Sequence, residues 1–497
     1  NQSNTGAMFY ADDMLLYSST KSQLIQQIKH SFTFFLKNKM SISIKKSCYQ
    51  PNSSDFEDSI PKRIHINDQI EPLEMIPYNE SYKYLGINIS PSLKWKHHFN
   101  YIYNKIKKRI NVLKSYLDAI PCNLFIRIIN TAIIPLITYG SSIIKYTNSQ
   151  KNSFNKLINQ TVKKKFKLRK PDPLLPLYAH IGLKDFNQEM KIESLDTFHY
   201  IMNLNTTQNH IVKTLYKYCN EQKLNTWIDR IYKYSNEFNI SWKEGRTMKN
   251  PFPDSYDSLR YDIKQNLFNY WQNCRKSLPL NCNVYTDGSV KGENIGYSII
   301  VKEDESLNQK GTIVKEWSII SPSEIIPNNN YNKIYQAELF AIVIVTMRLP
   351  KNAHCNVYSD STSVVKTVYS LLQWKEYNDL KARNLTCKSL LYMIYSNIHS
   401  KNISLFIHHI KAHNGNIYNE KADKLAKEGS EMNKYYSMYF CNKNWQFGSK
   451  FNTVYNNHIV IDCKLRNVLS TIVKQDHINQ WKSLDSQGRY ANYLLHP

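Results

Sequence analysis

The sequence has little glycine, little proline and no long apolar run. Only 13 Gly and 17 Pro occur among 497 residues, whereas 42% of the residues are hydrophobic. This composition excludes a collagen-like or linker-dominated chain and favours folded domains. Because single hydrophobic cores stop growing near roughly 250 to 300 residues, we expect at least two domains.

Paired cysteines and membrane-length segments are also missing. Nine cysteines are present, but no two form a Cys-x-x-Cys pair, which excludes a zinc ribbon or knuckle and predicts reduced thiols. The best apolar stretch, 128–144, is broken by Asn130, Pro135 and Gly140 and is shorter than the ~20 residues that cross a bilayer. No secretory signal follows Asn1, so we expect an intracellular protein of nucleus or cytoplasm, not secreted and without a membrane partner.

Acidic residues are scarce, and the shortage is local. The chain has 65 Lys and Arg against 40 Asp and Glu, a net charge of +25. Residues 81–171 hold 18 basic side chains and one acid, Asp118, with aromatic residues interleaved, whereas residues 281–432 hold 17 basic and 15 acidic. Such a basic and aromatic stretch predicts contacts with a nucleic-acid backbone, although a single lysine run is more often a solvated helix face. The candidate contacts are Lys105, Lys107, Lys108, Arg109, Lys163, Lys164 and Lys165.

These shifts in composition predict a multidomain chain. An α/β part is expected at 281–432, after a basic helical region at 91–170 and a helical segment at 171–280. Residues 1–90 and a C-terminal tail at 433–497, with a small strand and helix docked on a neighbour, complete the division.

Periodicity in the α/β part predicts the order β, β, β, α, β, α, α, β, α. The expected strands are 283–286, 296–301, 316–320, 354–358 and 403–410, and the expected helices are 334–347, 362–372, 385–399 and 419–428.

Four carboxylates lie at strand ends or on helices of this predicted order. Asp287 and Asp360 are expected to end the first and fourth strands, Glu338 to lie in the first turns of a helix, and Asp423 to lie in the last helix. Oxygen ligands at one sheet edge suit Mg²⁺, and two such ions about 3.5 to 4 Å apart can support phosphodiester hydrolysis. One Asp-Gly-Ser alone would be an ordinary turn, but four acids in this order are a stronger signal.

His413 follows the last predicted strand, on a Gly-containing loop ten residues before Asp423. A lone histidine is more often a packing or surface residue than a catalyst. In this context it could move a proton or help the product leave. His408 and His409 have no such context, and we interpret them as strand residues.

Residues 281–432 resemble type 1 ribonuclease H domains. The matching motifs are YTDGS at 285–289, QAEL at 336–339, YSDS at 358–361 and HNGNIYNEKADKLAK at 413–427. The resemblance implies a five-stranded mixed sheet with flanking helices that hydrolyses the RNA strand of RNA–DNA hybrids with two divalent ions, Mg²⁺ or Mn²⁺.

The same resemblance implies roles for single residues. It carries the metal ligands onto Asp287, Glu338, Asp360 and Asp423, and a mobile catalytic histidine onto His413. It also implies that Ser289 and Asn419 contact the hybrid. The segment between 372 and 403 departs from some members of the family, because it has no dense basic handle for gripping substrate.

The N-terminal segment FYADDMLLY at 9–17 predicts a β-hairpin whose turn presents Asp12 and Asp13. It resembles the YADD motif of reverse transcriptases, and the sequence that follows resembles non-LTR (LINE-type) retrotransposon enzymes: a palm segment at 39–46, a primer grip at 82–86 and a thumb from 93. Asp12 and Asp13 would then form a partial polymerase site. A third carboxylate and the fingers would have to precede Asn1, so we expect no polymerase activity from this chain alone, and a hairpin with an exposed edge that orders poorly.

The sequence therefore predicts an RNA–DNA hybrid endonuclease within a truncated retrotransposon reverse transcriptase. Two alternatives stay open. One is a catalytically inactive remnant that binds nucleic acid through its basic region, and the other is an RNA-directed DNA polymerase once the upstream part is supplied.

Overall fold

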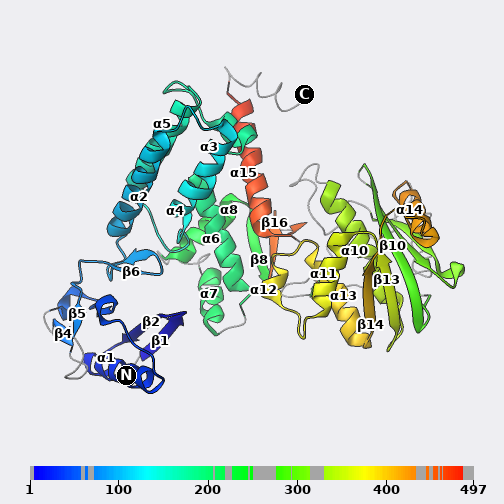
Figure 1. Ribbon diagram of the computed structural model, residues 1–497, viewed down its shortest axis with the longest axis horizontal. Coiled ribbons are helices and arrows are strands. Elements are labelled where there is room, and N and C mark those ends of the chain that lie inside the picture. The colour runs from blue at the N-terminus through cyan, green and yellow to red at the C-terminus, as the bar shows by residue number, and fades with distance from the viewer. Residues whose placement is uncertain are drawn as a thin grey trace. The chain divides into compact units, whose positions relative to one another are not determined.

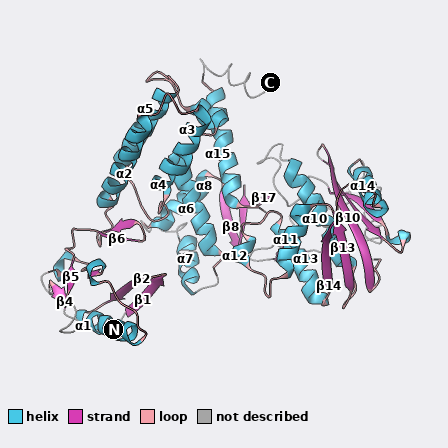
Figure 2. Ribbon diagram, in the orientation of Figure 1, coloured by secondary structure: helices cyan, strands magenta, loops and turns pink. Residues whose placement is uncertain are grey.

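The computed structural model in Figure 1 divides into two compact units, residues 1–177 with 181–187, and residues 178–180 with 188–497. Figure 2 shows how helices and strands are distributed within them. The structure describes residues 5–57, 62–64, 72–204, 207–218, 226–244, 247–249, 276–292, 294–313, 330–412, 414–431, 444–446, 451–456, 459–461 and 463–484.

The first unit combines short strands with amphipathic helices. Its strands are β1 (Thr5–Tyr10), β2 (Asp13–Ser18), β3 (Cys48–Tyr49), β4 (Arg63–Ile64), β5 (Leu73–Met75), β6 (Tyr82–Tyr84) and β7 (Ile87–Ile89). Its helices are α1 (Lys21–Lys37), α2 (Lys96–Lys114), α3 (Cys122–Ile128), α4 (Ile134–Thr138) and α5 (Asn148–Lys165), with a π-helical turn between α3 and α4.

Helix α2 shows why the basic region is helical. Its buried residues Ile102, Ile106 and Ile110 recur every four residues, so they form one apolar stripe and leave the lysines on the other side. Helix α5 starts at a capping box, in which the Thr147 hydroxyl accepts from the Gln150 backbone N–H and Gln150 Oε1 accepts from the Thr147 backbone N–H. Both helices lie in the basic segment at 91–170.

The predicted N-terminal hairpin is also present. Strands β1 and β2 pair antiparallel through Tyr10 and Asp13, and Ala11 in the turn has a φ of +52°. Among the described residues the two strands have no further strand beside them, and Phe9 and Tyr10 are both 65% exposed. The exposed edge that the sequence predicts is therefore observed.

The second unit contains the α/β part and the segments around it. Its strands are β8 (Ile240–Glu244), β9 (Thr247–Lys249), β10 (Asn281–Lys291), β11 (Asn294–Val301), β12 (Gln309–Ile313), β13 (His354–Ser359), β14 (Ser404–His409), β15 (Asn444–Gln446), β16 (Phe451–Tyr455) and β17 (Ile459–Val460). Its helices are α6 (Phe186–Met202), α7 (Thr207–Tyr218), α8 (Trp227–Glu237), α10 (Asn330–Arg348), α11 (Thr362–Leu372), α12 (Asp379–Ala382), α13 (Lys388–Lys401), α14 (Ile417–Ser430) and α15 (Leu465–Lys482).

A five-stranded mixed sheet organises the α/β part, in the order β12-β11-β10-β13-β14. Strands β10, β11 and β12 are antiparallel neighbours, whereas β13 runs parallel to both β10 and β14. Helices α10, α11 and α13 lie on one face of the sheet, and α14 packs on the other (Figure 1). This architecture confirms the predicted fold class for the α/β part.

Two strand predictions need correction. Strand β10 does not end at Asp287 but continues to Lys291, because Asp287 and the next four residues stay paired with β11. The third strand of the sheet is β12 at 309–313, while the predicted strand 316–320 lies outside the described residues. Glu338 also lies more than two turns after the start of α10, and not in its first turns.

Two segments that flank the α/β part pack together. Strand β8 pairs with β16, which pairs with β17. Helix α6 shares one hydrophobic core with α15, including the buried Phe198 and Leu469. Arg466 of α15 forms ion pairs with Glu189 and Glu193 of α6, the first at 2.8 Å. Strand β9, which follows β8 in the chain, also pairs with β15, which precedes β16. The C-terminal tail therefore packs on the helical segment that precedes the α/β part.

Within the described residues, no helix has the length and apolar composition needed to cross a bilayer.

Candidate active site

Asp287 and Glu338 are brought together by the packing of α10 on β10. Gly288 makes this approach possible, because a Cβ atom at that position would lie 2.6 Å from the backbone nitrogen of Glu338 and 2.7 Å from Cβ of Ala337. No other residue fits without moving the helix. The glycine of the Asp-Gly-Ser motif therefore serves close packing, and not a turn.

Asp360 completes a cluster of three carboxylates. It follows β13, whose parallel pairing with β10 ends at Tyr285 and Tyr358, so Asp287 and Asp360 both lie two residues beyond the last pair. One carboxylate oxygen each from Asp287, Glu338 and Asp360 lies within 4.8 Å of the others. Asp287 is 5% exposed and Glu338 is 3% exposed. Asp360 is half-buried. Such a set of carboxylate oxygens suits a hard divalent cation.

The electrostatics of the cluster also fit a cation. Burial, followed by the charge of Asp360, raises the pKa of Asp287 to about 7. Burial, followed by the charges of Asp287 and Asp360, raises the pKa of Glu338 well above its usual range. Three carboxylates so close together cannot all ionise cheaply, so a bound cation would stabilise the charged form.

Asp423 lies on α14, on the other face of the sheet, and is close enough for its charge to contribute to the raised pKa of Asp287. Helix α14 approaches β11 at Gly296, where a Cβ atom would meet the Ala426 carbonyl oxygen at 2.2 Å. Asp423 is not within the 4.8 Å cluster; its Oδ2 accepts from Lys427 Nζ at 2.6 Å. This hydrogen bond raises the pKa of Lys427. Sequence reasoning missed Lys427, although its spacing of four from Asp423 was visible.

The two predicted hybrid contacts lie beside the acids. Asn419 is 3% exposed, and its Nδ2 donates to Asp360 Oδ2 at 3.4 Å. Its Oδ1 is buried without a hydrogen-bond partner among the described residues. Ser289 is half-buried on β10, where it pairs with Gly296. Asn419 can therefore orient Asp360 as well as face a ligand.

Further neighbours of the acids were not predicted. Ser359 Oγ donates to Glu338 Oε2 at 3.4 Å. His409 Nε2 lies 3.2 Å from the Asp360 carbonyl oxygen and 3.1 Å from Thr362 Oγ1. The YSDS motif, which contains Ser359, could have indicated that this serine lies near the acids. His409 is a strand residue as expected, and no sequence motif indicates its position near Asp360. His413 lies outside the described residues.

The basic candidates of the first unit fall into two groups. Those of the first group form hydrogen bonds with backbone carbonyl oxygens. Lys165 Nζ donates to the carbonyl oxygens of Leu117 and Ile120, and Arg109 donates to that of Ala132 at 2.6 Å. Lys163 similarly donates to the Lys170 carbonyl.

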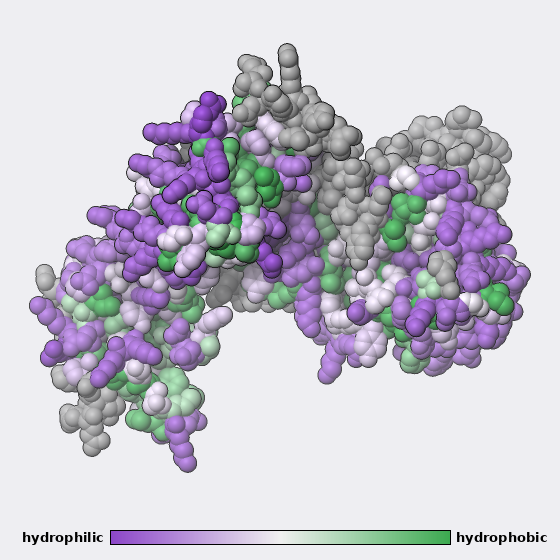
Figure 3. Space-filling model, turned by 45° about the horizontal axis from the view of Figure 1, so that its top comes forward, coloured by the Kyte–Doolittle hydropathy of each residue, from purple (hydrophilic) through white to green (hydrophobic). Residues whose placement is uncertain are grey.

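The second group is open to solvent. Lys107, Lys108 and Lys164 are exposed, and Lys105 is half-buried with its Nζ 5.7 Å from the Tyr101 ring centroid. Hydrophilic side chains cover much of the visible surface of α2 and α5 in Figure 3. Part of the predicted contact set is therefore used for internal structure, and part is available to a ligand.

Asp12 and Asp13 are both exposed in the β1–β2 hairpin. Among the described residues, the group of acids, histidines or cysteines close enough to share a metal is Asp287, Glu338 and Asp360. The N-terminal pair is therefore not joined by a third described ligand.

Comparison with known proteins agrees with the α/β geometry. A search of curated proteins finds no match to the chain. The family model of RNase H matches residues 280–431, which include the five-stranded sheet and all four acids. This part of the chain is an RNase H domain.

Proposed function

We propose that the chain is an endonuclease that hydrolyses the RNA strand of RNA–DNA hybrids with divalent metal ions. One observation carries the proposal: Asp287, Glu338 and Asp360 offer carboxylate oxygens within 4.8 Å of one another, inside an RNase H domain. The buried acids have little other use, because such a cluster destabilises a fold unless a cation is bound.

Asp287, Glu338, Asp360 and Asp423 would hold two Mg²⁺ or Mn²⁺ ions. When bound, such ions activate water and neutralise charge that develops on the phosphate. Asn419 holds the carboxylate of Asp360 in place, and Lys427 holds that of Asp423 until a metal competes for it.

The proposed reaction adds water to an RNA phosphate and breaks its bond to the 3′ oxygen. The products are a 5′-phosphate and a 3′-hydroxyl, so the leaving oxygen needs a proton. His413 is proposed to deliver that proton or to help the product leave. Ser289 and Asn419 are proposed to contact the hybrid, in which RNA is distinguished by its 2′-hydroxyl groups.

The decisive experiment is a cleavage assay on a labelled RNA–DNA hybrid with Mg²⁺. We expect cleavage by the chain and almost none by Asp360→Asn, which keeps the size of the side chain and removes its charge. Equal cleavage by both proteins, or cleavage by neither, would overturn the proposal. RNA–RNA and DNA–DNA duplexes of the same sequence test whether the hybrid is required.

We also propose nucleic-acid binding by the basic region, supported by the exposed Lys107, Lys108 and Lys164. Binding alone is the function that would remain if the nuclease proposal fails. The proposed context is a retrotransposon reverse transcriptase, with residues 1–90 as a partial palm and 91–170 as a thumb-like region. A primer-extension assay tests it: no activity is expected from this chain, and activity is expected only when the upstream part is supplied.

A further inference from the structure

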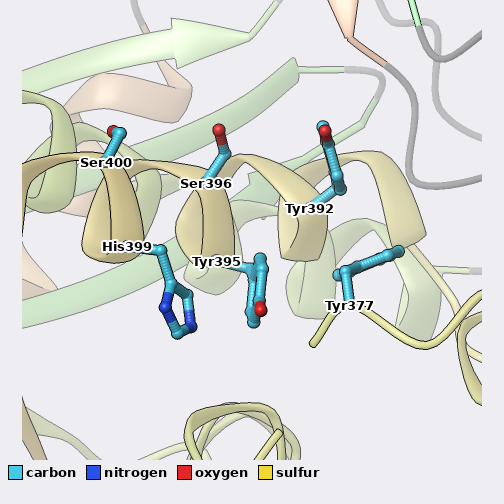
Figure 4. Close-up of a pocket in the computed structure, with 6 residues that line it drawn as sticks. All are labelled: Tyr377, Tyr392, Tyr395, Ser396, His399 and Ser400. Atoms are coloured by element: carbon cyan, nitrogen blue, oxygen red, sulfur yellow. The ribbon is translucent and has the colours of Figure 1, made fainter. Parts of the chain in front are cut away.

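The outer face of α13 carries an aromatic pocket, and none of the four acids lines it. The inner side of this helix is buried in the domain core, through Leu390, Leu391, Ile394 and Ile398. On the outer side, residues spaced three and four apart face a hollow of about 540 Å³, together with one residue from the loop between α11 and α12 (Figure 4). The lining residues are Tyr377, Tyr392, Tyr395, Ser396, His399 and Ser400.

Its rings are held in place before any ligand binds. The Tyr377 hydroxyl donates to the Lys388 carbonyl at 3.3 Å, and the Tyr395 hydroxyl donates to the Lys375 carbonyl at 3.2 Å. The Tyr377 ring lies 4.8 Å from that of Tyr392 at an interplanar angle of 84°, and 5.4 Å from that of Tyr395 at 61°. A site organised in this way loses little conformational entropy on binding.

The pocket offers polar groups next to its rings. Figure 4 shows the rings of Tyr395 and His399 on the same side of α13, and their centroids are 3.9 Å apart. Ser396 is half-buried and His399 is exposed, so both polar side chains can be reached from solvent. A planar heterocycle with donors and acceptors on its edge could stack on these rings and bond to these groups.

Two exposed lysines lie in the segment that forms the pocket. Residues 373–402 contain five basic side chains, but Lys388 is buried, and Lys401 Nζ donates to the carbonyl oxygens of Thr346, Met347 and Leu349. Arg383 lies over the Tyr200 ring, 4.6 Å from its centroid. Lys375 and Lys381 are exposed, and Lys381 Nζ lies 5.9 Å from the Trp374 ring centroid. These two lysines are therefore the cations of the segment that a phosphate can reach.

We propose that this pocket binds a nucleobase of single-stranded nucleic acid, with the phosphates directed toward Lys375 and Lys381. Bases inside a duplex are stacked and paired, so only an unpaired base can enter a side pocket and stack on tyrosine. The inference goes beyond the proposed nuclease function, because it requires neither metal nor hydrolysis.

The test measures binding by the full chain in EDTA, with two probes. Adenosine is uncharged and does not respond to the basic region of the first unit; its binding is followed by saturation-transfer NMR. A short single-stranded oligodeoxyadenylate is followed by fluorescence anisotropy at high salt, which weakens phosphate contacts more than stacking. The pair of substitutions Tyr392→Ala and Tyr395→Ala should weaken adenosine binding about tenfold or more.

Two controls separate the pocket from general surface effects. The pair Tyr392→Phe and Tyr395→Phe keeps both rings and should retain most of the affinity. Tyr369→Ala removes a tyrosine of α11 that is 60% exposed and does not line the pocket, so it should change nothing. If the double alanine variant melts early by circular dichroism, the single Tyr392→Ala replaces it.

The inference is overturned if the wild-type chain does not bind adenosine, or if Tyr369→Ala weakens binding as much as the pocket variants. It is also overturned if a proline-rich peptide binds the pocket and adenosine does not, since aromatic grooves also hold such peptides. Hybrid cleavage is assayed separately with Mg²⁺. Tyrosine-dependent binding of adenosine without hybrid cleavage would support the pocket and reject the nuclease proposal. Hybrid cleavage without tyrosine-dependent binding would support the nuclease proposal and reject the pocket.

Discussion

The acidic edge of the RNase H domain and the basic face of α2 and α5 were both predicted from charged residues, yet they are built differently. The acids are few and mostly buried, and they converge from β10, α10 and the end of β13. The cations are many, and several bond to carbonyl oxygens of their own unit. A small buried cluster therefore identifies a site more sharply than a large surface charge does, since burying like charges is costly and exposing them is not.

The largest effect should come from the acidic edge. Glu338→Gln removes one charge from the buried cluster, and we expect hybrid cleavage to fall by ~10³-fold or more, because a metal ligand is lost. Initial rates of cleavage with Mg²⁺ measure it. Glu376→Gln, the same change at an exposed residue outside the cluster, should cleave normally. An equal loss of cleavage in both variants would contradict a specific role of the clustered acids.

The second effect concerns the pH dependence of stability without metal. Because the pKa of Asp287 is raised from 3.8 to about 7, the folded chain holds a proton that the unfolded chain has released. The free energy of unfolding in EDTA should therefore fall as the pH rises from about 4 to about 7, by on the order of 3 kcal/mol. Thermal melts at several pH values measure this fall.

Mg²⁺ should restore the lost stability near neutral pH, because it compensates the charge of the cluster. Asp287→Asn should flatten the dependence on pH. Melting temperatures in EDTA that rise over the same range, in wild type and variant alike, would contradict the electrostatic account of the cluster.

A third, smaller effect distinguishes structural from ligand-binding cations. Lys165→Met leaves the carbonyl oxygens of Leu117 and Ile120 without their donor. We expect the free energy of unfolding to fall by about 1 to 3 kcal/mol while affinity for nucleic acid changes little. Urea denaturation and hybrid binding are compared with Lys164→Met, a neighbouring exposed lysine that should show the opposite pattern. Similar losses of stability in both would erase the distinction.

The smallest effect is expected from the exposed lysines. Replacing Lys107, Lys108 and Lys164 together by glutamine should weaken hybrid binding mainly at low salt and lower the slope of log affinity against log salt by up to about 3. Anisotropy titrations at several salt concentrations give the slope. An unchanged slope would mean that these residues form only a solvated helix face.

Much of the RNase H domain could be predicted. The β-branched and aromatic residues of β11, the alternation in β13 and the helical stripes of α11 and α14 are local signals, and they place Asp287, Glu338 and Asp360 in the correct order. The continuation of β10 past Asp287 could not be predicted, because Asp and Gly also suit a turn. That residue pair stays in the strand since β11 supplies its hydrogen bonds and α10 occupies the space above Gly288.

The sequence by itself determined the local elements, the segregation of charge and the identity of the acids, because periodicity and residue chemistry act over short distances. The tertiary structure alone decided which groups meet. In the tertiary structure α6 and α15, which are separated in the sequence by the α/β part, share one hydrophobic core. Asn419 donates to Asp360, Lys427 donates to Asp423, and Lys165 donates to a backbone carbonyl oxygen of its own unit. Such contacts depend on which surfaces are buried together, and burial is a property of the whole fold.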